Sequence, residues 1–465
     1  MTFFMKFSVM SALVLSAPVS AIAQEDLLPP EGEVPPPATV SNPVIQPVPG
    51  INFEPPKPVV QEWNREDARA LLTFIEGISA EGLNPQDYQP NELRQALDGD
   101  EGGVSSNVDS WSMFDATGEE PQLDEVASRS FTWLVEDLRD GRTPMDDRKQ
   151  WFVIDSDPDF YPTGDLMAEA LEKHDVAGVL QSLNPTHPDY AVLKQALADT
   201  PESEKAKRKL IRANMDRWRW LPRDLGTQYL ITNVPEYELR LTVNDQIIRT
   251  YKTVVGKPGR TATPQLAEVV EGVVFNPTWT VPQSIVKGEG LGQKVLNNPQ
   301  WAAAHGYKAT KGENGFINVV QQPGPGNSLG VMKLDMPNEH AIFLHDTPAK
   351  AYFNRDKRAL SHGCIRTERA LELGMTMAIL GKGATKDEAV EISTSGEYTK
   401  VPLKKTMPVY ITYFTMATDI NGELNTFDDI YDRDGPVLAS FDKPRERNRA
   451  RVTDEEVVPI EDPGL

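Results

Sequence analysis

The spacing of apolar residues changes near residue 200, and this change constrains the fold more than any other feature of the sequence. Between residues 63 and 200, apolar side chains recur at intervals of three and four, which places them on one face of an α-helix. After residue 210, short apolar runs alternate with glycine and proline, as is typical of strands. The sequence therefore predicts an α+β fold, with a mainly helical domain over 63–200 and a β-rich domain over 210–418.

Within these domains the sequence predicts individual elements. Helices are expected over residues 63–78, 123–138, 165–183 and 190–198, with a loop over 98–122 and a charged connector over 202–212. Strands are expected over residues 229–234, 238–243, 246–255, 269–275, 316–320, 330–333 and 341–344. Asn244 and Asp245 suit a two-residue turn, so the second and third strands should form a hairpin.

The first 23 residues have the pattern of a secretory signal peptide, in which Lys6 precedes an apolar stretch and Ala23 ends a small-residue cleavage site. No later segment approaches the roughly 20 apolar residues of a membrane-spanning helix, so a soluble, exported protein without a transmembrane anchor is predicted. Residues 24–62 are rich in proline and acids and should form an extended linker. The charged residues 442–465 should form a disordered tail.

Cys364 is the only cysteine in 465 residues, so the chain cannot form an internal disulfide bond. A free thiol in an oxidising compartment is open to oxidation, which makes chemistry a better reason for its presence than packing. The alternative is a small buried hydrophobic side chain. Cys364 is therefore the candidate nucleophile.

The chain carries a formal net charge of -22 at pH 7. This charge argues against a nucleic-acid partner or an anionic membrane, because both need clustered lysine and arginine. Five basic residues nevertheless surround Cys364 in the sequence: Lys350, Arg355, Lys357, Arg358 and Arg366. They are either an ordinary solvated cluster or a local positive charge that favours the thiolate and attracts a carboxylate.

A nucleophilic cysteine needs a base, a nearby positive charge or a helix N-terminus, because an ordinary thiol is mostly protonated at neutral pH. Thr367 is a candidate N-cap for a helix that follows the cysteine, which would place Cys364 just before its positive end. Gly363 permits a tight turn and leaves backbone N–H groups free to face an oxyanion.

His345 is the preferred base, because it ends the predicted strand 341–344 and a neighbouring strand can approach the sulfur directly. His362 is only two residues from Cys364, so the two side chains can point the same way without touching. A backbone carbonyl, such as that of Asp346, would orient the second ring nitrogen of His345. The alternative is a structural histidine at the end of a strand.

A zinc site built from His340, His345, His362 and Cys364 is a rival interpretation of the same residues. His340 and His345 are separated by an odd number of residues, so in a strand they would face opposite sides. No Cys-x-x-Cys or His-Glu-x-x-His pattern supports a metal. The prediction is therefore a site without a metal or other cofactor.

Taken together, the motifs resemble those of a known family. The run Ser361-His362-Gly363-Cys364-Ile365-Arg366, preceded by His345-Asp346-Thr347-Pro348, resembles the active-site signature of the L,D-transpeptidases with a YkuD-type catalytic domain. Residues 214–220, 275–282 and 327–330 resemble further segments of the larger Gram-negative members. The similarity extends over residues 61–435 and is strongest over 210–415.

This resemblance implies a β-rich catalytic domain attached to a helical scaffold domain, with residues 284–315 inserted as a helical cap over the site. Cys364 would attack the carbonyl of meso-diaminopimelate in a tetrapeptide stem of peptidoglycan and release D-alanine, while His345 transfers the proton. The N–H groups of Gly363 and Cys364 would bind the oxyanion. The remaining residues assigned to oxyanion binding or substrate positioning are Ser361, His362, Arg366 and Asp346.

The resemblance also implies the acceptor of the acyl group, the cellular compartment and the alternative functions. The acyl group would pass to a second stem, which forms a 3–3 cross-link in the periplasm, or to a lysine of an outer-membrane lipoprotein. Transfer to water would instead make the protein an L,D-carboxypeptidase or an amidase. A third alternative is a non-catalytic wall-binding scaffold. A separate peptidoglycan-binding module, which many large relatives carry, has no matching pattern in this chain.

Overall fold

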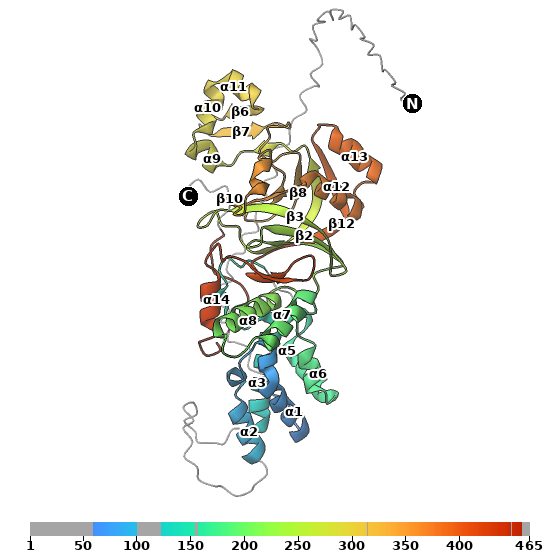
Figure 1. The fold of residues 1–465 in the computed structure, drawn as a ribbon, viewed down its shortest axis with the longest axis vertical. Coiled ribbons are helices and arrows are strands. Elements are labelled where there is room, and N and C mark those ends of the chain that lie inside the picture. Colours follow the sequence, from blue (N-terminus) through green and yellow to red (C-terminus); the bar gives the residue numbers. More distant parts are fainter. Residues whose placement is uncertain (1–58, 100–121, 154–156, 314, 448, 458–465) are drawn as a thin grey trace, which may run out of the picture. The chain divides into compact units, whose positions relative to one another are not determined.

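The structure is a computed structural model that describes residues 59–99, 122–153, 157–313, 315–447 and 449–457, all within one compact unit (Figure 1). The predicted signal peptide 1–23, most of the linker 24–62 and most of the loop 98–122 lie outside these ranges. None of the helices in the described ranges is long and apolar enough to cross a membrane.

The N-terminal part is helical, as the sequence predicts. Its helices are α1 (Arg65–Gly77), α2 (Pro90–Gly99), α3 (Leu123–Asp140), α4 (Asp157–Phe160), α5 (Thr163–Glu172), α6 (Val176–Gln181), α7 (Pro188–Asp199) and α8 (Lys205–Arg219). Asn64 caps α1 by accepting a hydrogen bond from the N–H of Asp67. The predicted helix 165–183 is divided into α5 and α6, because His174 has a positive φ of 50° and interrupts the helical hydrogen bonds.

The apolar stripes of these helices meet in one core. Leu71 and Ile75 of α1 pack with Phe131 and Leu134 of α3, and all four side chains are fully buried. Helices α1 and α3 contact each other, and α2 packs against both (Figure 1). Burial of these stripes, rather than intrinsic helix propensity, stabilises such helices.

The segment predicted to be a connector, 202–212, instead begins helix α8. Its first turns are exposed and charged, which hides the helical spacing of the buried residues Ile211, Met215 and Trp218 that follow. Helix α8 packs against α7 and contacts α3 (Figure 1). It thereby joins the helical core to the β-rich domain.

The β-rich domain is built on one large sheet with the strand order β10-β3-β11-β9-β8-β4-β12-β1-β2. Strand β2 also pairs with β3, so the sheet closes on itself. The strands are β1 (Gln228–Asn233), β2 (Glu238–Val243), β3 (Gln246–Gly256), β4 (Leu266–Phe275), β8 (Met332–Asp335), β9 (Leu344–His345), β10 (Ala359–Ser361), β11 (Ile365–Thr367) and β12 (Thr399–Thr412).

Several predicted strands need correction. Strand β9 has two residues rather than the predicted 341–344, because Ala341 has a φ of 54° and the Asn338 side chain folds the preceding segment by bonding Met336 and Ile342. Strand β12 was not predicted, because proline residues interrupt its pattern and a bulge lies between Pro402 and Met407.

The other predicted features of the sheet are confirmed. Asn244 and Asp245 both have positive φ angles, 49° and 57°, as a tight hairpin between β2 and β3 requires. Helix α12 (Ala370–Leu380) packs against β4 and β8, and its residues Leu373 and Met377 are fully buried in the sheet core. Two further helices are α13 (Lys386–Thr394) and α14 (Asp434–Ser440), and a small hairpin consists of β13 (Met416–Thr418) and β14 (Leu424–Thr426).

The predicted cap, 284–315, is helical only in its first half. It contains α9 (Gln283–Gly288), α10 (Leu291–Asn297) and α11 (Pro299–Ala304), and it ends in strand β6 (Tyr307–Lys311). Strand β6 pairs with β7 (Ile317–Gln321), which also pairs with β5 (Trp279–Thr280). Val286, Val295 and Val319 form a separate core for this insertion. Helices α9, α10 and α11 lie beside strands β6 and β7 (Figure 1).

The C-terminal segment differs from the predicted disordered tail in its described part, 442–447 and 449–457. The Arg445 side chain is 4% exposed, and its Nε lies 3.0 Å from Oδ2 of the fully buried Asp137 on α3. Arg449 and Tyr88 also donate to Asp137, at 2.8 Å each. The dense charge of this segment predicted disorder, but Arg445 and Arg449 form ion pairs with the buried Asp137 of the helical part.

We expect Arg445→Met to lower the free energy of unfolding by about 3 kcal/mol, because it removes one partner of a buried carboxylate. Denaturation in urea measures the change. The matched control is Arg451→Met, which breaks the exposed pair with Asp159 and should have a much smaller effect. Equal effects of the two substitutions would contradict a buried C-terminal attachment.

Candidate active site

Cys364 lies in a short turn that joins β10 to β11. Strand β3 pairs with both of these strands, in parallel with β10 and antiparallel with β11. Gly363 has a φ of 122°, which favours glycine. The Ser361 hydroxyl accepts a hydrogen bond from Gly363 N–H at 3.1 Å and donates to the carbonyl of Cys364 at 2.6 Å. Ser361 therefore closes the turn rather than facing a substrate.

These bonds correct the predicted oxyanion site. The N–H of Gly363 is occupied by Ser361, so it is not free to bind an oxyanion in this structure. Among the described residues, none accepts a hydrogen bond from the N–H of Cys364. Of the two predicted donors, only the N–H of Cys364 is therefore available to bind an oxyanion.

His345 reaches the site from the strand next to the turn. Strand β9 pairs in parallel with β11, with Leu344 opposite Ile365 and His345 opposite Arg366. Leu344 and Ile365 are both fully buried in the core of the sheet. Because side chains alternate along a strand, His345 and Arg366 lie on the other face. Cys364 directly precedes β11, and its thiol is close enough to Arg366 for that charge to lower its pKa.

Cys364 and His345 are not hydrogen-bonded in this structure. The sulfur of Cys364 donates to the carbonyl of Ala341 at 3.6 Å. Nδ1 of His345 is buried and has no hydrogen-bond partner among the residues that the structure describes. The structure thus brings the two predicted residues to two neighbouring strands, with the thiol directed to a backbone carbonyl.

Burial controls the protonation of His345, whose side chain is 5% exposed. Burial lowers its pKa to about 3, and the positive charge of Arg366 acts in the same direction. The backbones of Asp346 and Leu329 raise the pKa by less than burial lowers it, and neither carbonyl accepts a hydrogen bond from Nδ1. His345 is therefore neutral at pH 7 and can accept a proton.

Burial also controls the thiol. Cys364 is partly exposed, yet the protein surrounds the sulfur closely enough to raise its pKa to about 11. The backbone of Phe343 and the charges of Lys333 and Arg366 lower the pKa by less than burial raises it. Positive charge thus favours the thiolate in the predicted direction, but desolvation outweighs it and the resting thiol is neutral.

The predicted effect of a helix N-terminus on the Cys364 thiol is absent as well. Thr367 is the last residue of β11, and helix α12 begins after Arg369, whose side chain makes no capping hydrogen bond. Cys364 is thus separated from the N-terminus of α12 by a complete strand. The sequence could not show this, because Ile365 to Thr367 is too short a run to be recognised as a strand.

Most side chains of the predicted basic cluster bond to groups other than Cys364. Arg358 donates to the carbonyls of Thr253 and Tyr237, and Lys357 pairs with Asp428. Lys350 pairs with Asp346. Only Arg366 among the predicted cations acts on the thiol.

Lys333 is a site residue that the sequence reasoning missed. It lies opposite His345 in the pairing of β8 with β9. Its neighbours Met332 and Leu334 are fully buried in the core, so Lys333 points to the face that carries the site. That alternation was present in the predicted strand 330–333 and its flank and could have identified Lys333.

Asp346 has a structural role. Its Oδ2 accepts a hydrogen bond from Val331 N–H at 3.0 Å, and its other oxygen pairs with Lys350. Gly330 has a φ of 64°, and a side chain there would collide with the Asp346 carboxylate. The carboxylate thus holds the turn before β8 and is not directed at a substrate.

His362 is exposed and close to the inserted segment. Burial of the ring lowers its pKa, and Lys257 acts in the same direction, whereas Glu289 at the end of α9 raises it. Glu289 therefore lies within electrostatic reach of His362. Glu289 belongs to the predicted cap, 284–315, whose position over the site stays a prediction.

The zinc alternative receives no support from the geometry. Across the described residues, no group of three or more histidine, cysteine, aspartate or glutamate side chains is arranged to hold a metal ion. The ring of His340 packs against Phe152 with a centroid distance of 4.3 Å and an interplanar angle of 57°. His340 thus has a packing role.

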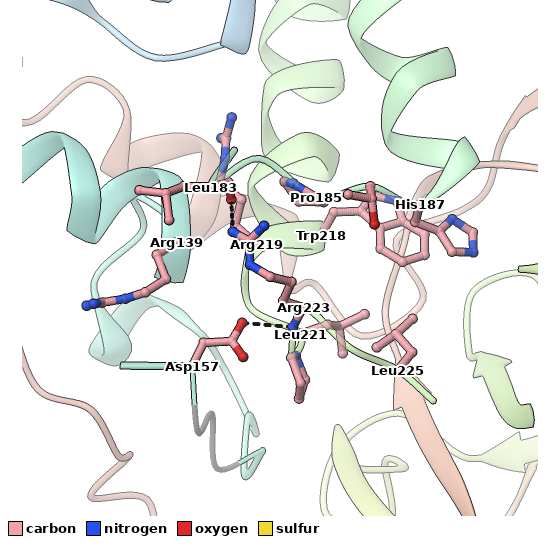
Figure 2. Close-up of a pocket in the computed structure, with 12 residues that line it drawn as sticks. Arg139, Asp157, Leu183, Pro185, His187, Trp218, Arg219, Leu221, Arg223 and Leu225 are labelled. Carbon is pink, nitrogen blue, oxygen red and sulfur yellow. Dashed lines mark hydrogen bonds between the residues drawn. The ribbon is translucent and has the colours of Figure 1, made fainter. Parts of the chain in front are cut away.

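A cavity of about 20 Å³ lies elsewhere, between the helical part and the end of α8. Figure 2 shows Arg139, Asp157, Arg219 and Arg223 around it. The N–H of Arg223 donates to Asp157 at 2.8 Å, which joins the segment after α8 to α4. The cavity has space for about one water molecule, so it is part of the packing between these elements rather than a substrate site.

The pKa of Cys364 leads to a direct prediction. Because only the thiolate reacts, the rate of alkylation by iodoacetamide should rise through the whole range from pH 6 to pH 10, without a plateau, as expected for a pKa of about 11. Cys364 is the only thiol, so no other residue contributes. Lys333→Met removes a charge that lowers the pKa, so it should slow alkylation at every pH. A plateau below pH 8 would contradict the neutral resting thiol.

Comparison with known proteins agrees with this arrangement. The L,D-transpeptidase catalytic domain (YkuD) family matches residues 227–378, and the Scaffold domain family matches residues 61–197. A Haemophilus influenzae protein with the name "Putative L,D-transpeptidase" is 29% identical over 286 residues. The match covers 58% of this chain and 57% of that protein, so the chain spans little more than half the length of this relative.

Three solved L,D-transpeptidases are more distant relatives. The Mycobacterium smegmatis enzyme is 12% identical with a TM-score of 0.21, over 40% of this chain and 58% of that one. Mycobacterium tuberculosis L,D-transpeptidase 1 is 11% identical with a TM-score of 0.18, over 40% and 61%. A mutant of the Enterococcus faecium enzyme is 14% identical with a TM-score of 0.19, over 46% and 64%.

One family match covers the helical part up to α7, and the other covers every strand of the closed sheet except β12, together with Cys364 and His345. The chain therefore contains a YkuD-type L,D-transpeptidase catalytic domain that follows a Scaffold domain.

Proposed function

We propose that this protein forms 3–3 cross-links in peptidoglycan through an acyl-enzyme on Cys364. The observation that carries the proposal is the position of a neutral thiol and a neutral imidazole at two neighbouring parallel strands. The same two cations, Arg366 and Lys333, act on both side chains, which supports their proximity. Rotation of the thiol away from the carbonyl of Ala341 would direct it to His345.

In the first half-reaction, the sulfur of Cys364 attacks the carbonyl carbon of meso-diaminopimelate in a tetrapeptide stem. The thiol proton passes to the neutral imidazole of His345, whose low pKa must rise as negative charge develops on the sulfur and the substrate beside it. The bond between that carbonyl and the terminal D-alanine breaks, and His345 returns the proton to the departing amine. A thioester and free D-alanine result.

In the second half-reaction, the side-chain amine of another stem attacks the thioester. Its proton passes through His345 to the cysteine sulfur, and a new amide bond forms. One amide bond replaces another, so no nucleotide is needed. This property suits the periplasm, to which residues 1–23 would direct the protein.

The oxyanion of each tetrahedral intermediate would bind to the N–H of Cys364, the predicted donor that Ser361 leaves free. Arg366 and Lys333 add positive charge on the same face, where negative charge develops. Burial that disfavours a resting thiolate also strengthens these interactions in the intermediate. Arg366 and the exposed His362 are the residues that would meet the carboxylates of the stem.

Incubation with purified disaccharide tetrapeptide should yield dimers that carry a 3–3 cross-link, together with free D-alanine, as measured by mass spectrometry. Tripeptide without dimer would assign the protein as an L,D-carboxypeptidase. A product joined to an added lipoprotein peptide would identify a lysine as acceptor, and cleavage of that product would identify an amidase. No reaction at all, and no mass increase with a carbapenem, would favour a non-catalytic wall-binding protein.

Two substitutions test the assigned roles. Cys364→Ser should fold normally and form no thioester, because the hydroxyl is a much weaker nucleophile. His345→Gln should lower turnover by at least about 100-fold, the usual contribution of a general base. The matched control is His174→Gln, which removes an exposed imidazole of the Scaffold domain and should leave turnover unchanged. Normal cross-linking by either active-site variant would refute these roles.

A further inference from the structure

Thr263 lies in the segment between β3 and β4 and is fully buried. Its hydroxyl lies 2.7 Å from the carbonyl oxygen of Gly363 and 2.9 Å from the N–H of Gly256. The N–H of Gly256 can only donate, so the hydroxyl oxygen accepts this bond. The hydroxyl proton is therefore directed to the carbonyl of Gly363.

This hydrogen bond fixes the orientation of the peptide group that contains the N–H of Cys364. The carbonyl of Gly363 and the N–H of Cys364 belong to one planar trans peptide, so they point in opposite directions. With the carbonyl held by Thr263, the N–H must point away from Thr263. Ser361 holds the two adjoining groups, the N–H of Gly363 and the carbonyl of Cys364.

The position of Thr263 is itself fixed by its surroundings. A side chain at Gly256 would collide with the carbonyl of Thr261, so glycine is needed for the segment to fold back onto the end of β3. The Tyr431 hydroxyl donates to the carbonyl of Gly256 at 2.6 Å and accepts from the N–H of Thr263 at 3.3 Å. Arg433 donates to the carbonyl of Thr263 at 3.0 Å.

We infer that Thr263 is a positioning residue for acylation, which orients the Gly363–Cys364 peptide so that the N–H of Cys364 meets the oxyanion. The inference rests on the proposed function. It predicts a selective effect. Formation of the thioester needs an oriented oxyanion donor, whereas alkylation of the same sulfur by iodoacetamide forms no oxyanion at a carbonyl. Loss of the Thr263 hydroxyl should therefore slow acylation and not alkylation.

Thr263→Val keeps the shape of the side chain and removes the hydroxyl. Loss of an oxyanion donor costs about 100- to 1000-fold, and a misdirected donor should cost less, so we expect acylation by a carbapenem to slow by about 10- to 100-fold. The maximal rate should fall rather than the apparent affinity. Alkylation at fixed pH should stay within about threefold of the wild-type rate. Thr263→Ser restores the hydroxyl and should return acylation to near the wild-type rate.

Each outcome has a distinct meaning. If the wild-type protein gains no carbapenem mass, the proposed function fails. If the wild-type protein is acylated and Thr263→Val is acylated as fast, the inference is wrong. An equal loss of acylation and alkylation would also overturn it, because that result indicates general damage to the turn.

A second variant covers the case in which Thr263→Val does not fold. Tyr431→Phe leaves Thr263 in place and removes the hydroxyl that holds Gly256 and the N–H of Thr263. It should slow acylation by several-fold while alkylation remains unchanged. Thermal unfolding of both variants identifies any loss of the native state. A Tyr431→Phe protein with the wild-type acylation rate would count against the inference.

Discussion

The parallel pairing of β9 with β11 is the interaction on which the site depends. Both strands are very short, so neither could hold its position alone. Their pairing is secured because the sheet closes through β2 and β3, and because Leu344 and Ile365 are buried in its core. With that face fixed, His345 and Arg366 must appear on the other face. A nonlocal network of strands thus determines the position of both candidate site residues, Cys364 and His345.

Burial, rather than charge, sets the electrostatic character of this site. Both Arg366 and Lys333 favour the thiolate, but desolvation favours the neutral thiol and the neutral imidazole more strongly. A neutral thiol is protected from oxidation, because the thiolate is the reactive species. In the proposed reaction, the same buried surroundings would strengthen the interaction of cations and N–H groups with an oxyanion.

The helical part and the β-rich part are held together by polar groups that are fully buried. Asp137 receives hydrogen bonds from Tyr88, Arg445 and Arg449, so the C-terminal segment is attached to helix α3. The segment before it also contributes, since Tyr431 and Arg433 bond the loop that contains Thr263. Residues near the C-terminus, far from Cys364 in sequence, thus contact both the Scaffold domain and the supports of the active-site turn.

The sequence by itself determined the division into a helical and a β-rich part, the regular helices and most strands, because apolar periodicity directly reflects which face is buried. It also singled out Cys364 and His345 as candidates, since residue chemistry and motif order are local. Tertiary structure decided the rest. In the folded chain the N–H of Gly363 donates to Ser361, the Asp346 carboxylate accepts from the N–H of Val331, and Lys333 lies opposite His345. It also raised the pKa of the thiol. These properties depend on nonlocal hydrogen bonds and desolvation, which arise only when distant segments pack together.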